Sequence, residues 1–423
     1  MRAFMNTRAA FVGIGLAVNL LVLVRGVILM TALDYGDLGL VALVQGGILF
    51  AGMLHFGLLN GGYRLLCHLR GHARQRVVDL AYTGFLAIGA AILLAAIVIA
   101  LAVERPDHRM VALLGAAGGI ATLLRTWMMN EMVAGGRLAS ANWINALAIA
   151  ASLGLLALLP FAPAPVAVAS IVLQPVLFAM LAPLSRAVLR PRALRFSKRL
   201  ARVVFRAGFP LFLTGIAMQF NTFAERSYVT AELGLDALGR LYLAFLFLGL
   251  FQMVPNLVQQ VYLPEIVRAW NARESGRIAR ESRMLLGWLA AYCTLAGLAL
   301  WLLAEPLLAL VLPRYVPDLR WVYLLAPGLA AFALSTPFAL IFNVTIRYRW
   351  FMIAYGSGSA ATVLVLGGAL VGGSALTLDG VTILRSAVYA GMALLLVIGW
   401  ASLSRRFPEF RWTGLRRDTA DPV

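Results

Sequence analysis

Twelve apolar runs, each long enough to cross a bilayer, constrain this chain more than any other feature of its sequence. A membrane-spanning helix needs about 20 apolar residues at a rise of 1.5 Å per residue. Hydrophobic residues make up 62% of the chain and charged residues only 13%, whereas a soluble domain has about 25% charged residues. The predicted fold class is an all-α polytopic membrane protein. We expect its spans near residues 9–31, 38–59, 77–102, 110–129, 141–160, 165–184, 207–229, 241–262, 284–303, 322–342, 351–371 and 381–402.

The distribution of basic residues tests this set of spans. If the N-terminus is cytoplasmic and the spans alternate, the cytoplasmic segments hold 27 of the 36 basic residues and the external segments hold 5. Cytoplasmic loops of membrane proteins collect arginine and lysine, so this ratio supports twelve spans with both termini in the cytoplasm. The same rule accounts for the net charge of +18 and leaves no reason to expect a nucleic acid partner.

The longest cytoplasmic connection divides the chain into halves. We predict an N-terminal lobe at residues 1–184, a basic linker at 185–206, a C-terminal lobe at 207–402 and a basic cytoplasmic tail at 403–423. The linker carries eight basic residues with leucine and valine between them. It is either a solvated connection or a basic amphipathic helix on the anionic inner leaflet, and the helical spacing favours the helix.

The two halves look like repeats of one unit. Tyr35–Gly39 precedes the second span and Leu235–Gly239 precedes the eighth, and a basic loop follows each of these spans. Six spans return the chain to its starting side, so the repeats are parallel, and two six-helix lobes of this kind can rock about a central lumen. Alternation of spans and basic loops is the competing explanation of the similarity.

Signals for an enzyme are weak. The only lysine, Lys198, does not follow a glycine, which excludes a phosphate-binding loop of the Walker type. His68 and His72 have a spacing that can bind metal on a helix, but arginines surround them and no third ligand is near. The external loops are too short for a catalytic domain. We expect no enzymatic activity, no metal and no cofactor.

Charged residues within the spans are the informative set, because a charge inside a membrane is costly and marks function by default. Arginines stand in spans one, four, seven and twelve, and acidic residues near them are few: Glu225 beside Arg226, and Glu131 after Arg125. An arginine near the end of a helix can instead extend to the lipid headgroups. That alternative is strong for Arg125 and Arg385 and weakest for Arg25, which lies deep in its span. A cavity lined by arginine with little acid attracts an anion, and the guanidinium matches phosphate.

Several short motifs resemble a known family. They are Phe209–Pro210 and Glu225–Arg226 in the seventh span, the stretch from Leu238 to Ala244 with Pro255 and Tyr262–Leu263–Pro264 after it, Arg25 followed by Tyr35–Gly36, and Ala304–Glu305–Pro306. The organisation of the whole chain resembles the polysaccharide-transport branch (O-antigen flippase type) of the multidrug/oligosaccharidyl-lipid/polysaccharide exporter superfamily.

The resemblance implies two six-helix lobes around a central lumen and a flippase of the bacterial inner membrane. Its substrate would be an oligosaccharide on a polyprenyl diphosphate, and its partners would include glycosyltransferases and a polysaccharide polymerase. Arg25 and Arg226 would hold the diphosphate, with Glu225 as charge partner, and Arg125 would capture it at the inner mouth. Amides suited to the sugar are Gln45, Asn145, Asn221, Gln252 and Asn256.

Two other functions compete with the flippase. One is an ion-coupled antiporter for small molecules, of the multidrug type, which should carry carboxylates in its spans. The other is a membrane-embedded enzyme that makes an envelope polymer. Carboxylates within the spans are scarce, which disfavours the antiporter, and short loops and missing catalytic motifs disfavour the enzyme.

Overall fold

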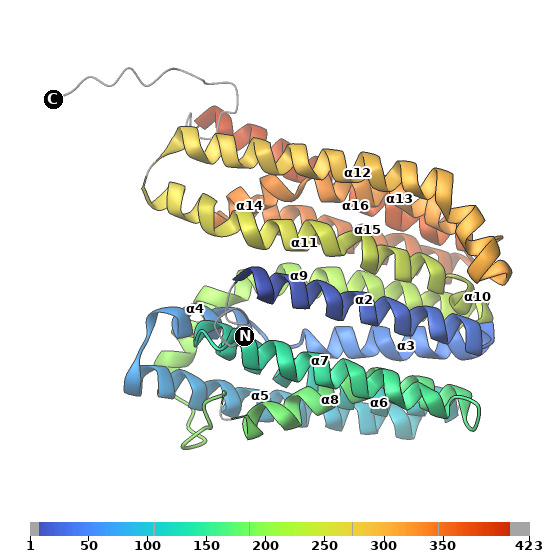
Figure 1. Ribbon diagram of the computed structural model, residues 1–423, viewed down its shortest axis with the longest axis horizontal. Coiled ribbons are helices and arrows are strands. Elements are labelled where there is room, and N and C mark those ends of the chain that lie inside the picture. The colour runs from blue at the N-terminus through green and yellow to red at the C-terminus, as the bar shows by residue number, and fades with distance from the viewer. Residues whose placement is uncertain (1–7, 105, 186, 273, 346, 407–423) are drawn as a thin grey trace. The chain divides into compact units, whose positions relative to one another are not determined.

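The structure is a computed structural model that describes residues 8–104, 106–185, 187–272, 274–345 and 347–406. Its described residues form helices joined by short loops and turns, without a β-strand (Figure 1). The chain ends, including residues 407–423 of the predicted basic tail, lie outside the described residues. The α-helices are α2 (Arg8–Ala32), α3 (Tyr35–Gly52), α4 (Leu58–His68), α5 (Gly71–Ala102), α6 (Pro106–Ala134), α7 (Leu138–Leu155), α8 (Pro163–Leu184), α9 (Lys198–Leu233), α10 (Leu235–Arg240), α11 (Tyr242–Asn271), α12 (Ser275–Val311), α13 (Leu319–Leu334), α14 (Thr336–Val344), α15 (Arg349–Gly372) and α16 (Leu378–Arg406), with 3₁₀ turns η1 (Leu156–Leu158) and η2 (Pro313–Tyr315).

Twelve stretches of helix within the described residues are long and apolar enough to cross a membrane. They match the twelve predicted spans one for one, so the predicted fold class is confirmed. Some spans combine two elements: α13 and α14 together form the span Leu319–Val344.

The chain packs as two compact units. Unit 1 comprises residues 1–246 and 362–378, and unit 2 comprises residues 247–361 and 379–423. The helices α11 and α15 each contribute one part to each unit. The lobes proposed from the sequence, 1–184 and 207–402, stay a prediction.

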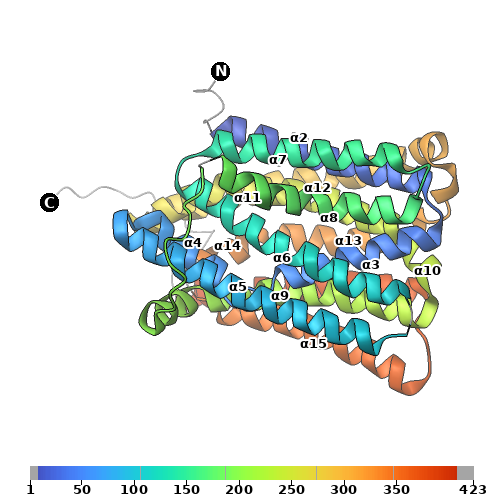
Figure 2. The same ribbon diagram turned by 90° about the horizontal axis from the view of Figure 1, so that it is seen from below.

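Unit 1 contains α2 to α10. In both views α7 runs along α2 on one side and along α8 on another (Figures 1 and 2). Its core surrounds the fully buried side chains of Trp127 and Phe178, with α4, α5 and α6 contributing leucine, valine and methionine. Between membrane-spanning helices such a core is stabilised by van der Waals packing, because lipid tails are as apolar as leucine.

The second span is shorter than predicted. We expected it to extend to residue 59, but α3 ends at Gly52 and α4 begins at Leu58. Phe56 and Gly57 both have positive φ angles, of 46° and 89°, which a continuing helix does not allow. Gly57 also lies directly against the backbone of Gly208 and Phe209 in α9. The break therefore lets α4 cross α9 with backbone touching backbone.

The linker differs from the predicted amphipathic helix. Residues 187–197 are irregular, and α9 begins at Lys198 and continues without a break into the seventh span. Two acidic side chains bind the irregular part: Asp79 Oδ1 accepts from the Arg192 N–H at 2.8 Å, and Glu131 Oε1 accepts from the Leu189 N–H at 2.5 Å. Irregular backbone needs such partners because it lacks the internal hydrogen bonds of a helix.

Unit 2 contains α12, α13, α14, α16 and parts of α11 and α15. Its core packs Leu285, Phe338, Phe342 and Leu396, all buried, with apolar side chains of α11 around them. At one end, Asp379 at the start of α16 accepts hydrogen bonds from Arg320 Nε at 3.0 Å and from Trp321 Nε1 at 2.8 Å. These contacts join the first turns of α13 and α16.

Candidate anion-binding site

A buried arginine in α2 forms the centre of the candidate site in unit 1. Arg25 is only 6% exposed. Its Nη1 donates to Ser152 Oγ at 3.0 Å, to Gln174 Oε1 at 3.3 Å and to the carbonyl oxygen of Ser170 at 3.4 Å. Ser152 in turn donates to the Ser170 carbonyl at 2.6 Å. The cation is thus held by α7 and α8 through groups that carry no charge.

A second arginine, Arg125 of α6, faces the same two helices. Its Nη2 donates to Asn145 Oδ1 of α7 at 2.9 Å, and its guanidinium lies 5.7 Å from the ring centroid of Phe178 in α8. Arg25 and Arg125 are close enough to repel each other electrostatically. Four helices of one unit therefore bring two cations together.

The charge of this pair is not balanced by an acidic hydrogen-bond partner among the described residues. The side chains that accept from Arg25 and Arg125 are a hydroxyl and two amides. A charge removed from water costs several kcal/mol unless an opposite charge compensates it. The pair is therefore suited to an anion, which would offset both the desolvation and the mutual repulsion.

Glu131 does not fill the role expected of it. The sequence places it after Arg125, and we considered it an acidic partner of that residue. In the structure it is buried, at 1% exposed, and accepts from the Leu189 N–H of the linker. Its Oε1 accepts a hydrogen bond from the linker, and the hydrogen-bond acceptor for Arg125 is Asn145 instead.

Arg226, in α9, is a third buried arginine of unit 1. It is 4% exposed, its Nη1 donates to the carbonyl oxygen of Ala42 in α3 at 2.5 Å, and its guanidinium lies 4.4 Å from the ring centroid of Phe245. The adjacent Glu225 is buried as well, at 6% exposed. Their predicted roles as diphosphate ligand and charge partner stay predictions.

Extension to the lipid headgroups does not explain the deep arginines. Arg25, Arg226 and Arg385 are 6%, 4% and 7% exposed, so their guanidinium groups lie inside the protein. For Arg385 the sequence favoured the headgroups; instead its guanidinium lies 5.8 Å from the ring centroid of Tyr389 in unit 2.

The amides predicted to bind the sugar lie in separate parts of the structure. Asn145 is bonded to Arg125, and Gln45 is half-buried on α3. The amide nitrogen and oxygen of Asn221, on α9, are both buried without a hydrogen-bond partner. Gln252 and Asn256 belong to unit 2 and line a pocket there. Their sugar-binding role stays a prediction.

Sequence reasoning missed the residues that hold Arg25. Ser152, Ser170 and Gln174 are ordinary polar residues in apolar spans. Polar residues inside a span that are followed by proline, as Gln174 is by Pro175, are a signal that could have been used. Within the described part of the chain, no group of histidine, cysteine and acidic side chains could hold a metal ion.

No protein-family model matches the sequence, and no curated protein matches it. Solved structures, in contrast, match nearly the whole chain. A multidrug resistance MATE family transporter of the MOP superfamily, in an inward-facing conformation, has a TM-score of 0.68 at 14% identity and covers 94% of this chain and 96% of its own. The lipid II flippase MurJ, in an inward closed conformation, has a TM-score of 0.71 at 12% identity, with coverages of 92% and 87%.

A third match concerns charge. A MOP superfamily transporter from Pyrococcus furiosus, for which a binding pocket of reverse polarity suggests a different function, has a TM-score of 0.60 at 15% identity and covers 93% of this chain and 94% of its own. At these identities the likeness establishes the fold. The chain shares the fold of these solved transporters.

Proposed function

We propose that this protein is a flippase that moves a polyprenyl-diphosphate-linked oligosaccharide across a bacterial inner membrane for synthesis of a surface polysaccharide. The observation that carries the proposal is the Arg25–Arg125 pair, two cations that contact the same two helices, α7 and α8, and whose described hydrogen-bond acceptors are all neutral. A diphosphate supplies the missing negative charge, and its oxygens match the planar donors of arginine.

The neutral partners have a definite role in this proposal. Ser152 and Gln174 fix the guanidinium of Arg25, and Asn145 fixes that of Arg125, without neutralising either charge. A carboxylate in their place would compete with the diphosphate. The lipid tail would stay in the bilayer while the lobes rock, so that the headgroup is exposed first to the cytoplasm and then to the exterior.

The comparisons support a flippase without specifying the cargo. One protein of this fold, MurJ, is a flippase for lipid II, and another has a pocket of reverse polarity. Both fit a member of the fold that binds an anionic headgroup.

We further propose that the termini are cytoplasmic, that linker residues 185–206 contact anionic lipid, and that a membrane potential or ion gradient drives transport. Glycosyltransferases and a polymerase would act beside it.

The test is a lipid extraction from cells that lack the protein. We expect a completed lipid-linked oligosaccharide to accumulate on the cytoplasmic leaflet, and wild-type protein to clear it. Arg25→Gln and Arg125→Gln proteins should fail to clear it at normal abundance, whereas Arg314→Gln, at an exposed position in η2, should restore transport. Full transport by both variants of the pair would refute the diphosphate site.

A multidrug-type antiporter is the second candidate, because a MATE transporter matches the fold nearly as well as MurJ does. Such a protein binds cations and needs carboxylates in its spans. Of the buried acidic side chains described in unit 1, Asp79 and Glu131 bind the linker, and Glu225 remains. Loss of cationic dye efflux in a Glu225→Gln variant, with the lipid-linked pool unchanged, would favour the antiporter.

A further inference from the structure

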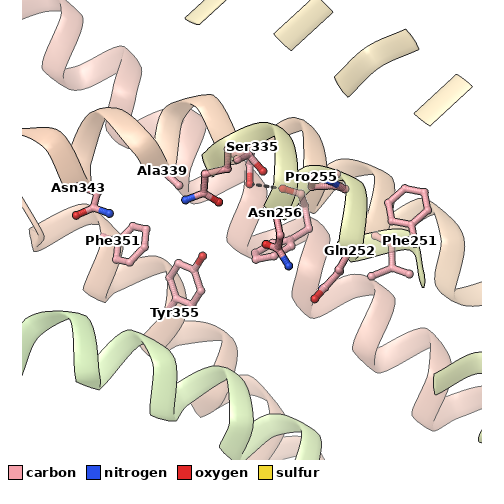
Figure 3. A pocket seen from close by; sticks show the side chains of 14 residues that line it. Phe251, Gln252, Pro255, Asn256, Ser335, Ala339, Asn343, Phe351 and Tyr355 are labelled. Carbon is pink, nitrogen blue, oxygen red and sulfur yellow. Dashed lines mark hydrogen bonds between the residues drawn. The ribbon is translucent and has the colours of Figure 1, made fainter. Parts of the chain in front are cut away.

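A pocket inside unit 2 has the chemistry of a carbohydrate site. It is a cavity of about 130 Å³ between α11, the α13–α14 junction and α15 (Figure 3). None of the described residues that line it is charged. Three amides of α11 contribute to its wall, Gln252, Asn256 and Gln259, together with the aromatic rings of Phe251, Phe332, Phe351 and Tyr355.

A proline within α11 and the break between α13 and α14 shape this pocket. Pro255 in α11 has no N–H, so the carbonyl oxygen of Phe251 loses its helical donor. The Tyr292 hydroxyl of α12 replaces that donor at 2.9 Å. Across the pocket, α13 ends at Leu334 and α14 begins at Thr336, which places the side chains of Ser335 and Thr336 on the wall. Interrupted spans of this kind form substrate sites in transporters.

One polar atom of the pocket wall has no hydrogen-bond partner within the protein. The Nε2 of Gln252 is buried without a hydrogen-bond partner, and an unmade bond of this kind costs about 1–3 kcal/mol. Figure 3 shows Gln252 and Asn256 extending from α11 toward the Tyr355 ring. A ligand oxygen in the pocket would supply the missing acceptor.

We propose that this pocket binds an uncharged sugar ring. A primary amide donates and accepts hydrogen bonds at once, as a sugar hydroxyl does, and aromatic rings offer flat apolar faces to the C–H side of a pyranose. A wall without carboxylate or guanidinium offers no opposite charge to a cationic drug or to a phosphate. The inference rests on the proposed function in taking this sugar to be part of the cargo, but the pocket's chemistry stands independently of the arginine pair.

The test uses the whole purified protein in nanodiscs made from lipids without sugar headgroups. Saturation-transfer NMR would measure binding of neutral hexoses, namely glucose, galactose, rhamnose and N-acetylglucosamine. We expect saturation transfer to at least one of them. Gln252→Met, of similar size but without the amide donor, should weaken its binding about fivefold or more, and Tyr355→Leu should do the same.

A control separates this pocket from polar residues elsewhere in the spans. Gln219→Met, which removes a half-buried amide of α9 in unit 1, should leave sugar binding unchanged. If none of the four hexoses binds, or if Gln252→Met binds as wild type does, the pocket is not a sugar site. Displacement of the signal by tetraphenylphosphonium, with loss of that displacement in Tyr355→Leu, would instead assign the pocket to lipophilic cations. In each of these cases binding of polyprenyl diphosphate at the arginine pair still decides the flippase proposal separately.

Discussion

The backbone carbonyl oxygen of Tyr35 packs directly against Gly239, and the carbonyl oxygen of Leu235 packs in the same way against Gly39. The two contacts are reciprocal, since Tyr35 and Gly39 lie in α3 whereas Leu235 and Gly239 lie in α10. These are the segments that the sequence presents as equivalent positions of two repeats. Each of the two segments therefore provides the glycine that the backbone of the other needs.

Gly239→Ala should destabilise the protein. A Cβ at this position would overlap the Tyr35 backbone carbonyl, and backbone, unlike a flexible side chain, cannot move aside. Overpacking costs about 1–3 kcal/mol, so the apparent Tm followed by size-exclusion fluorescence should fall. Gly249→Ala is the matched control, because no atom lies within 4 Å of a Cβ there. An equal Tm for the two variants would contradict the close contact.

Arg25→Gln should abolish binding of polyprenyl diphosphate and leave the protein at least as stable as wild type. The glutamine keeps a donor for Ser152 and Gln174, and the substitution removes a buried cation that these neutral groups do not balance. Breaking a true buried ion pair would instead cost about 3–5 kcal/mol. Thermal unfolding of the purified variant, measured beside a binding assay, distinguishes the two. A large fall in Tm would show that Arg25 has a structural anion partner.

Asp79→Ala should loosen the linker. Asp79 Oδ1 accepts both from the Arg192 N–H at 2.8 Å and from Gln75 Nε2 at 2.9 Å. Hydrogen bonds to a charged group contribute about 1.5–3 kcal/mol, so trypsin should cut after the exposed Arg192 and Arg195 about tenfold faster or more. Asp236→Ala, at the surface near the start of α10, serves as control. Unchanged cleavage rates at residues 192–199 would show that Asp79 does not hold this segment.

Tyr292→Phe and Pro255→Ala should be coupled. The Tyr292 hydroxyl satisfies the Phe251 carbonyl that Pro255 leaves without a donor, and its loss should cost about 1 kcal/mol of stability. In a Pro255→Ala background the alanine N–H can bond the same carbonyl. The tyrosine substitution should then cost little, and a double-mutant cycle on the free energy of unfolding measures the difference. Additive effects would mean that the hydroxyl does not replace the proline's missing N–H.

The sequence by itself determined the membrane class and the number of spans. Both depend on properties that are local along the chain, namely runs of about 20 apolar residues and arginines in the loops between them. The same local reading identified the deep arginine at 25 and the amides at 252 and 256, because polar residues stand out within an apolar run.

Only the tertiary structure decided which partners those residues have. Arg25 meets Ser152, Ser170 and Gln174 through contacts between spans far apart in the chain, and hydropathy contains no information about which faces of two helices meet. The break at Phe56 and Gly57 depends on backbone packing against α9, and the irregular linker depends on carboxylates of α5 and α6. Local patterns determine whether a segment spans the membrane. The partners of its buried polar and charged groups are determined only when distant segments pack together.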